Sequence, residues 1–192
     1  MSAPKGLAGL LLLLLAACTT PAAHPAAVAP PQVAAAPEQL KADWWRDNRW
    51  RYASDEATDA AYQRLLANQS PWPEWHQPSI VTLPAGLRFQ VALSPGQAAD
   101  CPGNFGTFDP IPDVRFVRYS LAVKTAWKAQ IDRVVTYEIA TPLSADTGVV
   151  GPQIDTAAGL YLPGGGSQLE TPKGPCADRA AKLRIVEVRP IR

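Results

Sequence analysis

The sequence has no excess of charge of either sign, few cysteines, few histidines and a single long apolar run. Its 18 Lys+Arg residues nearly cancel its 17 Asp+Glu residues, so it lacks the basic surplus that is typical of nucleic-acid-binding proteins. Three cysteines are too few for a disulfide-rich miniprotein, and one apolar run excludes a multi-span membrane protein. With only two histidines, a zinc site lacks ligands. We therefore expect neither a nucleic-acid partner nor a metal site.

What the chain has in quantity is apolar surface and proline. It is 47% hydrophobic and contains six tryptophans, which excludes a disordered protein. Its 20 prolines in 192 residues argue against a helix bundle, because proline interrupts helices. These values predict a globular domain that contains many turns.

The apolar run lies at the N-terminus and has the layout of a secretory signal. Lys5 precedes the apolar residues 7–15, and Ala16–Ala17–Cys18 follow. This order resembles the lipobox of bacterial lipoproteins, in which the cysteine is diacylated and becomes the mature N-terminus. We expect residues 1–17 to be a lipoprotein signal peptide and Cys18 to be the membrane anchor. Because Thr19 is not aspartate, the expected location is the outer membrane, facing the periplasm; the alternative is an ordinary signal with an incidental cysteine.

Without the signal peptide, the chain has a different net charge and a different number of unassigned cysteines. Residues 1–17 hold one basic and no acidic residue, so the mature chain is neutral. Residues 18–41 are rich in Ala and Pro and are expected to form a tether, followed by one globular domain over residues 42–192. Cys101 and Cys176 are then an even pair in an oxidising compartment, which predicts a disulfide between them; two free thiols are the alternative.

The hydrophobic periodicity of the domain predicts an α+β fold. Ser54 is a suitable cap for a helix that runs to about Asn68, and the rest reads mainly as strands. We expect a mostly antiparallel, curved β-sheet with an N-terminal helix, and a short helix over residues 122–130. The expected strands cover residues 80–83, 87–93, 114–121, 133–139, 159–162, 167–170 and 182–188.

Two features of the domain point to chemistry. Arg118, and with it Arg88, is expected on a strand, where an arginine on an apolar face requires an anionic partner, either a structural Asp or a bound phosphate. The second feature is the run Gly164–Gly165–Gly166–Ser167–Gln168, in which glycine permits a close backbone approach beside a neutral amide. A wide structural turn is the alternative for this run.

These residues together resemble the TNT domain, named for the tuberculosis necrotizing toxin and shared with secreted fungal NAD glycohydrolases. The likeness extends over roughly residues 80–170, about half of the chain. Its motifs occur in the family's order, as Leu83–Pro84–Ala85–Gly86 before Arg88–Phe89, Gly106–Thr107–Phe108–Asp109–Pro110, Arg118 before Leu121, Tyr137 before Pro142–Leu143 and Gly148, and Gly164–Gly165–Gly166–Ser167–Gln168. The chain departs from the family at Leu87, Gln90 and Val135, where the family has Asp, Gly and His.

The resemblance implies hydrolysis of the nicotinamide–ribose bond of NAD, with NAD as substrate and no cofactor. It implies that Gln168 contacts the ribose or orients water and that Glu170 stabilises the cationic transition state. Residues that would bind the dinucleotide are Arg88 and Arg118 at the pyrophosphate, Phe89 or Phe108 against a ring, and the backbone at Gly165 and Gly166.

Two other functions fit the sequence. Gln168–Leu169–Glu170 matches the Gln-x-Glu pattern of ADP-ribosyltransferases, which also use NAD. The replacement of the family's histidine by Val135, together with the neutral charge and the tether, fits a non-catalytic periplasmic lipoprotein that binds an unidentified protein partner.

Overall fold

The computed structural model describes residues 34–68, 70–77 and 79–192, and it confirms the α+β class. The predicted signal peptide, Cys18 and the predicted tether as far as residue 33 lie outside the described residues. The helices are α1 (Pro37–Asn48), the 3-10 turn η1 (Arg49–Arg51), α2 (Asp55–Ala67), α3 (Val114–Tyr119) and α4 (Cys176–Ala180). The strands are β1 (Ile80–Leu83), β2 (Arg88–Leu93), β3 (Phe105–Gly106), β4 (Arg133–Ile139), β5 (Leu143–Val149), β6 (Gln153–Asp155), β7 (Leu160–Leu162), β8 (Ser167–Glu170) and β9 (Leu183–Pro190).

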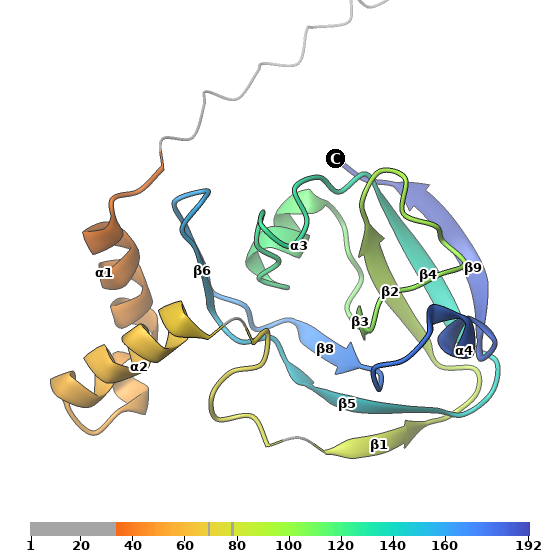
Figure 1. Cartoon of the computed structure of the whole chain (residues 1–192), viewed down its shortest axis with the longest axis horizontal. Helices are drawn as coiled ribbons and strands as arrows, with labels where there is room; N and C mark the ends of the chain where they lie inside the picture. Colours follow the sequence, from red (N-terminus) through yellow and green to blue (C-terminus); the bar gives the residue numbers. More distant parts are fainter. Residues whose placement is uncertain (1–33, 69, 78) are drawn as a thin grey trace, which may run out of the picture. The chain divides into compact units, whose positions relative to one another are not determined.

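Two antiparallel sheets form the centre of the domain and join at their edges (Figure 1). The first has the strand order β1-β5-β8-β3 and the second the order β2-β4-β9. A single bridge between Gln90 and Thr107 connects β2 to the chain just after β3, so the two sheets continue into one curved surface. A bulge in the β4–β9 pairing between Thr136 and Tyr137 adds a local bend.

The larger core lies on the face of the sheets toward which the odd-numbered residues of β2, β4, β5 and β8 point. Strand alternation places them there, because successive side chains of a strand point to opposite faces. Phe89 stacks on Tyr137 with ring centroids 5.5 Å apart, and the Tyr137 hydroxyl donates to the backbone oxygen of Ala99. The buried members of this core are Leu83, Phe89, Val91, Leu93, Val135, Tyr137, Ile139, Leu143, Ala145 and Leu169.

The opposite face of β2 and β4 is covered by α3. Ala92 and Val134, one residue out of phase with the larger core, pack with Val117 of α3. Because α3 covers only this part of the sheet, the neighbouring part of the same face, over β3 and β8, remains open to form a cavity.

The segment 114–121 does not form the predicted strand, so this prediction is wrong. Residues Val114–Tyr119 form α3, because the Asp113 carboxylate accepts a hydrogen bond from the Phe116 N–H at 2.7 Å and caps the first turn. The helix expected over residues 122–130 is also absent, since the segment forms turns held by side-chain hydrogen bonds.

The predicted N-terminal helix is confirmed as α2, with Ser54 accepting from the Ala57 N–H. It pairs with α1, which begins at Pro37, inside the segment expected to be a tether. Trp44 of α1 is buried against Tyr62 of α2, and both helices contact the hairpin of β6 and β7.

The predicted disulfide between Cys101 and Cys176 is confirmed and joins positions 75 residues apart. It attaches the loop before β3 to the start of α4. Within the described residues no helix is long and apolar enough to cross a membrane.

Candidate functional site

A cavity of about 270 Å³ opens on the sheet face beside α3. Its walls come from β2, β3, β8, α3 and the turns that follow α3. Val117, Leu121 and Val123 supply an apolar wall, while Gln90 and Gln168 supply amides from the sheet. The sheet itself brings these polar residues to one place, because Gln90 bridges to Thr107 and Thr107 hydrogen-bonds to Ser167 beside Gln168.

Gln168 is the most informative residue of this cavity. It is only 5% exposed, and its Nε2 has no hydrogen-bond partner in the described part of the chain. An unmet buried donor costs about 1–3 kcal/mol. Such a group is explained when a ligand supplies the missing acceptor. The predicted site residue Gln168 therefore lines a cavity with one donor unused.

The glycine run before Gln168 docks on the protein's own backbone. Gly164 and Gly166 donate their N–H groups to the carbonyls of Tyr119 and Ser120 at the end of α3, both at 2.9 Å. A Cβ at Gly166 would lie 2.9 Å from the Ser120 oxygen, so a larger residue does not fit. Gly165, at φ 93°, uses the left-handed backbone region that glycine permits. The run thus fixes β8 against α3, and Gly165 and Gly166 do not line the cavity.

Arg118 holds the turn that forms the far wall of the cavity. Its guanidinium donates to three backbone oxygens, at 2.8 Å to Val123, 2.6 Å to Lys128 and 3.2 Å to Ala129. Burial lowers the pKa of Arg118, while the charge of Asp155 opposes that change. The anionic partner expected from the sequence is thus replaced mainly by carbonyl oxygens. Arg118 acts as a support of the cavity, and it does not line the cavity.

Lys128 lines the cavity and carries a positive charge. Its ammonium donates to Gln97 Oε1 at 2.8 Å, and both residues line the cavity. Burial lowers the pKa of Lys128, and the like charges of Arg118 and Arg133 lower it further. A bound anion would relieve this repulsion, so the wall at Lys128 suits a phosphate or another anionic group.

The remaining predicted binding residues lie away from the cavity. Arg88 pairs with Glu138 at 3.0 Å on the exposed side of β2. Phe89 is buried in the larger core, and Phe108 packs at the edge of that core. The structure therefore brings Gln168 to the cavity and Arg118 behind its wall, and it does not bring Arg88, Phe89 or Phe108 there.

A polar cluster lies on the same sheet face as Gln168. Gly148 of β5 is the register partner of Gln168, and a Cβ on Gly148 would lie 2.9 Å from the His76 ring. His76 stacks on Trp72 with centroids 4.0 Å apart, and its Nε2 lies 2.9 Å from Asp146 Oδ2. The side-chain-free position of Gly148 is what lets the imidazole lie over the strand next to Gln168.

Glu170 and Asp146 anchor this cluster to neighbouring strands. Glu170, predicted as catalytic, accepts the indole N–H of Trp72 at 2.7 Å. Burial raises the pKa of Asp146, but hydrogen bonds from the Ser79 N–H and from His76 outweigh it, and the pKa lies below its usual range. Asp146 is therefore a carboxylate at neutral pH and orients the imidazole.

Lys128 and the His76–Asp146 pair were not predicted from the sequence. His76 and Asp146 are 70 positions apart and meet only through the pairing of β1 with β5. No local motif carries that information. Within the described residues no group of three or more His, Cys, Asp or Glu side chains is arranged to hold a metal ion.

Comparison with known proteins gives a likeness of fold. A chain in the structure of Tne2 in complex with Tni2 matches 62% of this chain and 97% of its own length, with a TM-score of 0.52 and 24% identity. A chain in the structure of Tse6 in complex with Tsi6 gives a TM-score of 0.41 at 14% identity, over 78% of this chain and 93% of its own. No family model and no curated protein sequence match this chain.

Proposed function

We propose that the cavity at Gln168 binds NAD or a related dinucleotide and that the domain hydrolyses the nicotinamide–ribose bond. The observation that carries the proposal is the buried, unpartnered Nε2 of Gln168 in the wall of the cavity. The TNT-like order of motifs supports it, because Gln168 follows the triple glycine as in that family. The fold likeness supports the domain type alone.

The residues of the cavity match the parts of this substrate. The apolar wall of Val117, Leu121 and Val123 suits a flat ring, and Gln168 Nε2 can donate to a carbonyl or hydroxyl oxygen of the ligand. Lys128 suits the pyrophosphate, in the role that the family resemblance implied for Arg88 and Arg118. Arg118 is assigned the positioning of the turn that carries Lys128.

The reaction requires little covalent chemistry from the protein. Water attacks the ribose carbon, the carbon–nitrogen bond breaks, and its electron pair neutralises the pyridinium nitrogen as nicotinamide leaves. The products are nicotinamide, ADP-ribose and one proton. The transition state is an oxocarbenium ion, and its stabilisation through charge is assigned to Glu170, which lies two residues after Gln168 on β8 but does not itself line the cavity.

The test is nicotinamide release from NAD by the purified chain. We expect release by the wild type and loss of at least a hundredfold in rate for Gln168→Ala, with a nearly unchanged thermal midpoint, since removal of the unmet donor offsets the loss of packed methylene groups. Gln153→Ala is the control for loss of a buried glutamine away from the cavity. Absence of release by the wild type, in both oxidising and reducing buffer, contradicts the proposal.

A second candidate is binding without turnover. It is favoured by Val135, which occupies the position of the family's histidine and is fully buried in the larger core. In that case the chain binds the dinucleotide or a protein partner, as one chain binds another in the Tne2–Tni2 complex. Saturable NAD binding without nicotinamide release identifies this case, whereas transfer of labelled ADP-ribose to protein identifies a transferase.

We also propose that the domain is anchored at Cys18 to the bacterial outer membrane, facing the periplasm. The lipobox-like order of residues 7–18 supports this. Labelled palmitate should be incorporated into the wild-type chain and should be absent from Cys18→Ser. Equal labelling of the two chains contradicts the anchor.

A further inference from the structure

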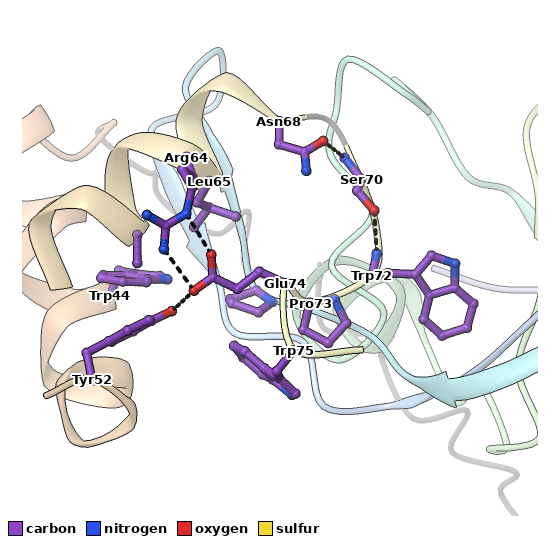
Figure 2. A pocket seen from close by; sticks show the side chains of 12 residues that line it. Trp44, Tyr52, Arg64, Leu65, Asn68, Ser70, Trp72, Pro73, Glu74 and Trp75 are labelled. Carbon is purple, nitrogen blue, oxygen red and sulfur yellow. Dashed lines mark hydrogen bonds and ion pairs between the residues drawn. The ribbon is translucent and has the colours of Figure 1, made fainter. Parts of the chain in front are cut away.

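A second cavity, of about 220 Å³, lies between α2 and the segment around Pro73 (Figure 2). Its wall is mainly apolar and aromatic, with Trp44, Tyr52, Leu65 and Trp75 among the lining residues. None of these four residues lines the cavity at Gln168. The second cavity is therefore a separate site, and a ligand can bind there whether or not the domain turns over NAD.

The wall of the second cavity contains one unused hydrogen-bond donor. Trp44 is 2% exposed, and its Nε1 has no partner in the described part of the chain. Figure 2 shows this nitrogen on the side of the ring that faces Glu74 and the cavity. A tryptophan at a purely structural position usually finds an acceptor when it is buried. The free N–H thus indicates a ligand that brings its own acceptor.

The charged side chains that line the second cavity, Arg64 and Glu74, are paired with each other. Glu74 accepts from the Tyr52 hydroxyl at 2.7 Å and from Arg64 Nε at 3.0 Å, so this carboxylate is already satisfied (Figure 2). Burial raises the pKa of Glu74, but the bonds from Arg64 and Tyr52 outweigh it and keep it ionised. A cavity in which the charged groups are paired to each other favours a neutral ligand.

The exposed indole ring of Trp75 lines the second cavity, and the ring of Trp50 lines an adjoining hollow that shares Tyr52, Glu74 and Trp75 with it. Trp50 is 72% exposed and Trp75 is 40% exposed, and the Arg51 guanidinium lies 4.2 Å and 4.1 Å from their ring centroids. The guanidinium fixes both rings through cation–π contacts and so preorganises them. Arg51 covers one face of the Trp75 ring, and the opposite face, beside the apolar pocket, is suited to stack the apolar face of a ring that is otherwise polar.

We propose that this second cavity binds an N-acetylated amino sugar. The acetamido oxygen accepts from Trp44 Nε1, the acetamido methyl contacts the apolar wall at Leu65, and the pyranose ring stacks on Trp75 at the mouth. N-acetylglucosamine, the unit of the sugar tested below, is neutral, carries one carbonyl acceptor on a small apolar group, and presents an apolar C–H face of its ring. These properties match the paired charges, the free indole N–H with its apolar wall, and the exposed rings of the cavity.

The experiment compares two trisaccharides, tri-N-acetylchitotriose and cellotriose, by isothermal titration calorimetry on the full chain. The two differ at the acetamido group and share the pyranose backbone. We expect saturable binding of tri-N-acetylchitotriose at a single site, and affinity for cellotriose that is at least tenfold weaker. Equal affinity for the two sugars, or no saturable binding of the first, overturns the proposal.

Three variants test whether the Trp44 N–H and the Trp75 ring contact the sugar. Trp44→Phe keeps an aromatic ring and removes the N–H, so affinity should fall about fivefold to tenfold. The thermal midpoint should fall as well, because Trp44 is buried in the core and the smaller ring leaves a void. Trp75→Ala should abolish stacking, while Trp127→Ala, a similarly exposed tryptophan outside this cavity, should bind as the wild type. Unchanged affinity in Trp44→Phe and Trp75→Ala overturns the proposal.

Discussion

Lys128 shows how a single residue can serve binding at a cost to stability. It is half-buried beside the charges of Arg118 and Arg133, and this environment lowers the pKa of its ammonium. For Lys128→Met we expect a thermal midpoint at least equal to that of the wild type, because the variant removes repulsion and keeps the aliphatic volume. We expect NAD affinity to fall about tenfold or more.

Calorimetric titration with NAD and thermal unfolding at pH 7 measure both effects of the lysine variant. Lys173→Met, at an exposed position outside the cavity, is the matched control and should change neither quantity. A Lys128→Met chain that is less stable but binds NAD as the wild type would show that the lysine is structural.

The site residues differ in how well the sequence predicted them. Gln168 lies at the cavity and is marked in the sequence because it follows three glycines, whose backbone must approach the end of α3 closely, so a local motif marks a tertiary contact. Arg88 lies on the predicted strand but away from the cavity, where it pairs with Glu138. Alternation along a strand indicates the face of a side chain, but it does not reveal which carboxylate lies opposite on the neighbouring strand. Lys128 lies in a turn with no periodicity, so no pattern marked it.

At the scale of elements, α3 shows why local patterns fail. The segment Val114–Tyr119 is rich in β-branched and aromatic residues, which favour a strand, although its apolar residues do not alternate strictly. The segment nevertheless forms a helix. Asp113 caps its first turn, and Val117 packs against Ala92 and Val134, so that tertiary packing outweighs the intrinsic β-propensity of the residues. Strands β2 and β4 were predicted correctly, since their apolar alternation coincides with burial on one face.

The cap of α2 gives a direct test of a predicted element. Ser54 accepts from the Ala57 N–H at 3.2 Å, and the Glu56 carboxylate also accepts hydrogen bonds at this end, from its own backbone N–H and from Ser54. Ser54→Ala should lower the free energy of unfolding by about 1 kcal/mol. Urea denaturation measures it, and Ser54→Asp, which preserves the acceptor, should restore most of the loss. A loss that persists in Ser54→Asp would contradict the capping role.

The turn behind the cavity is tied to β6 by Asp155. This carboxylate accepts from the Thr125 N–H at 2.5 Å and from its hydroxyl at 2.8 Å. Burial raises the pKa of Asp155, but these bonds, with those from Ala158 and the charge of Arg118, outweigh it and lower the pKa. A lowered folded-state pKa stabilises the fold above the unfolded value of about 3.9, and this contribution is lost as the pH falls through the folded-state pKa.

We therefore expect the wild type to lose stability below about pH 4, and Asp155→Asn to show a shallower loss over that range. The free energy of unfolding in urea at several pH values between 3 and 6 measures the slope. Asp100→Asn, at an exposed aspartate, should keep the wild-type slope. Equal slopes for Asp155→Asn and the wild type would contradict the assignment.

At the scale of the whole molecule, the disulfide links the loop before β3 to α4 over 75 positions. Closing a loop of this length in the unfolded chain contributes about 4 kcal/mol in the chain-entropy model. Reduction should therefore lower the thermal midpoint by many degrees in the wild type and have no effect in a Cys101→Ser/Cys176→Ser double variant. A reductant-insensitive wild type would contradict the stabilising role of the disulfide.

The central claim is that the cavity beside α3 is where the dinucleotide binds, and one titration tests it directly. Gly103 lines the cavity, is exposed, and has no heavy atom within 4 Å of an added Cβ, so Gly103→Trp obstructs the mouth without a clash at the backbone. Gly174→Trp is equally unhindered and lies outside the cavity. Calorimetry with NAD should show one site in the wild type and in Gly174→Trp, and none in Gly103→Trp. Equal NAD binding by all three chains would contradict the claim, as would no binding by the wild type.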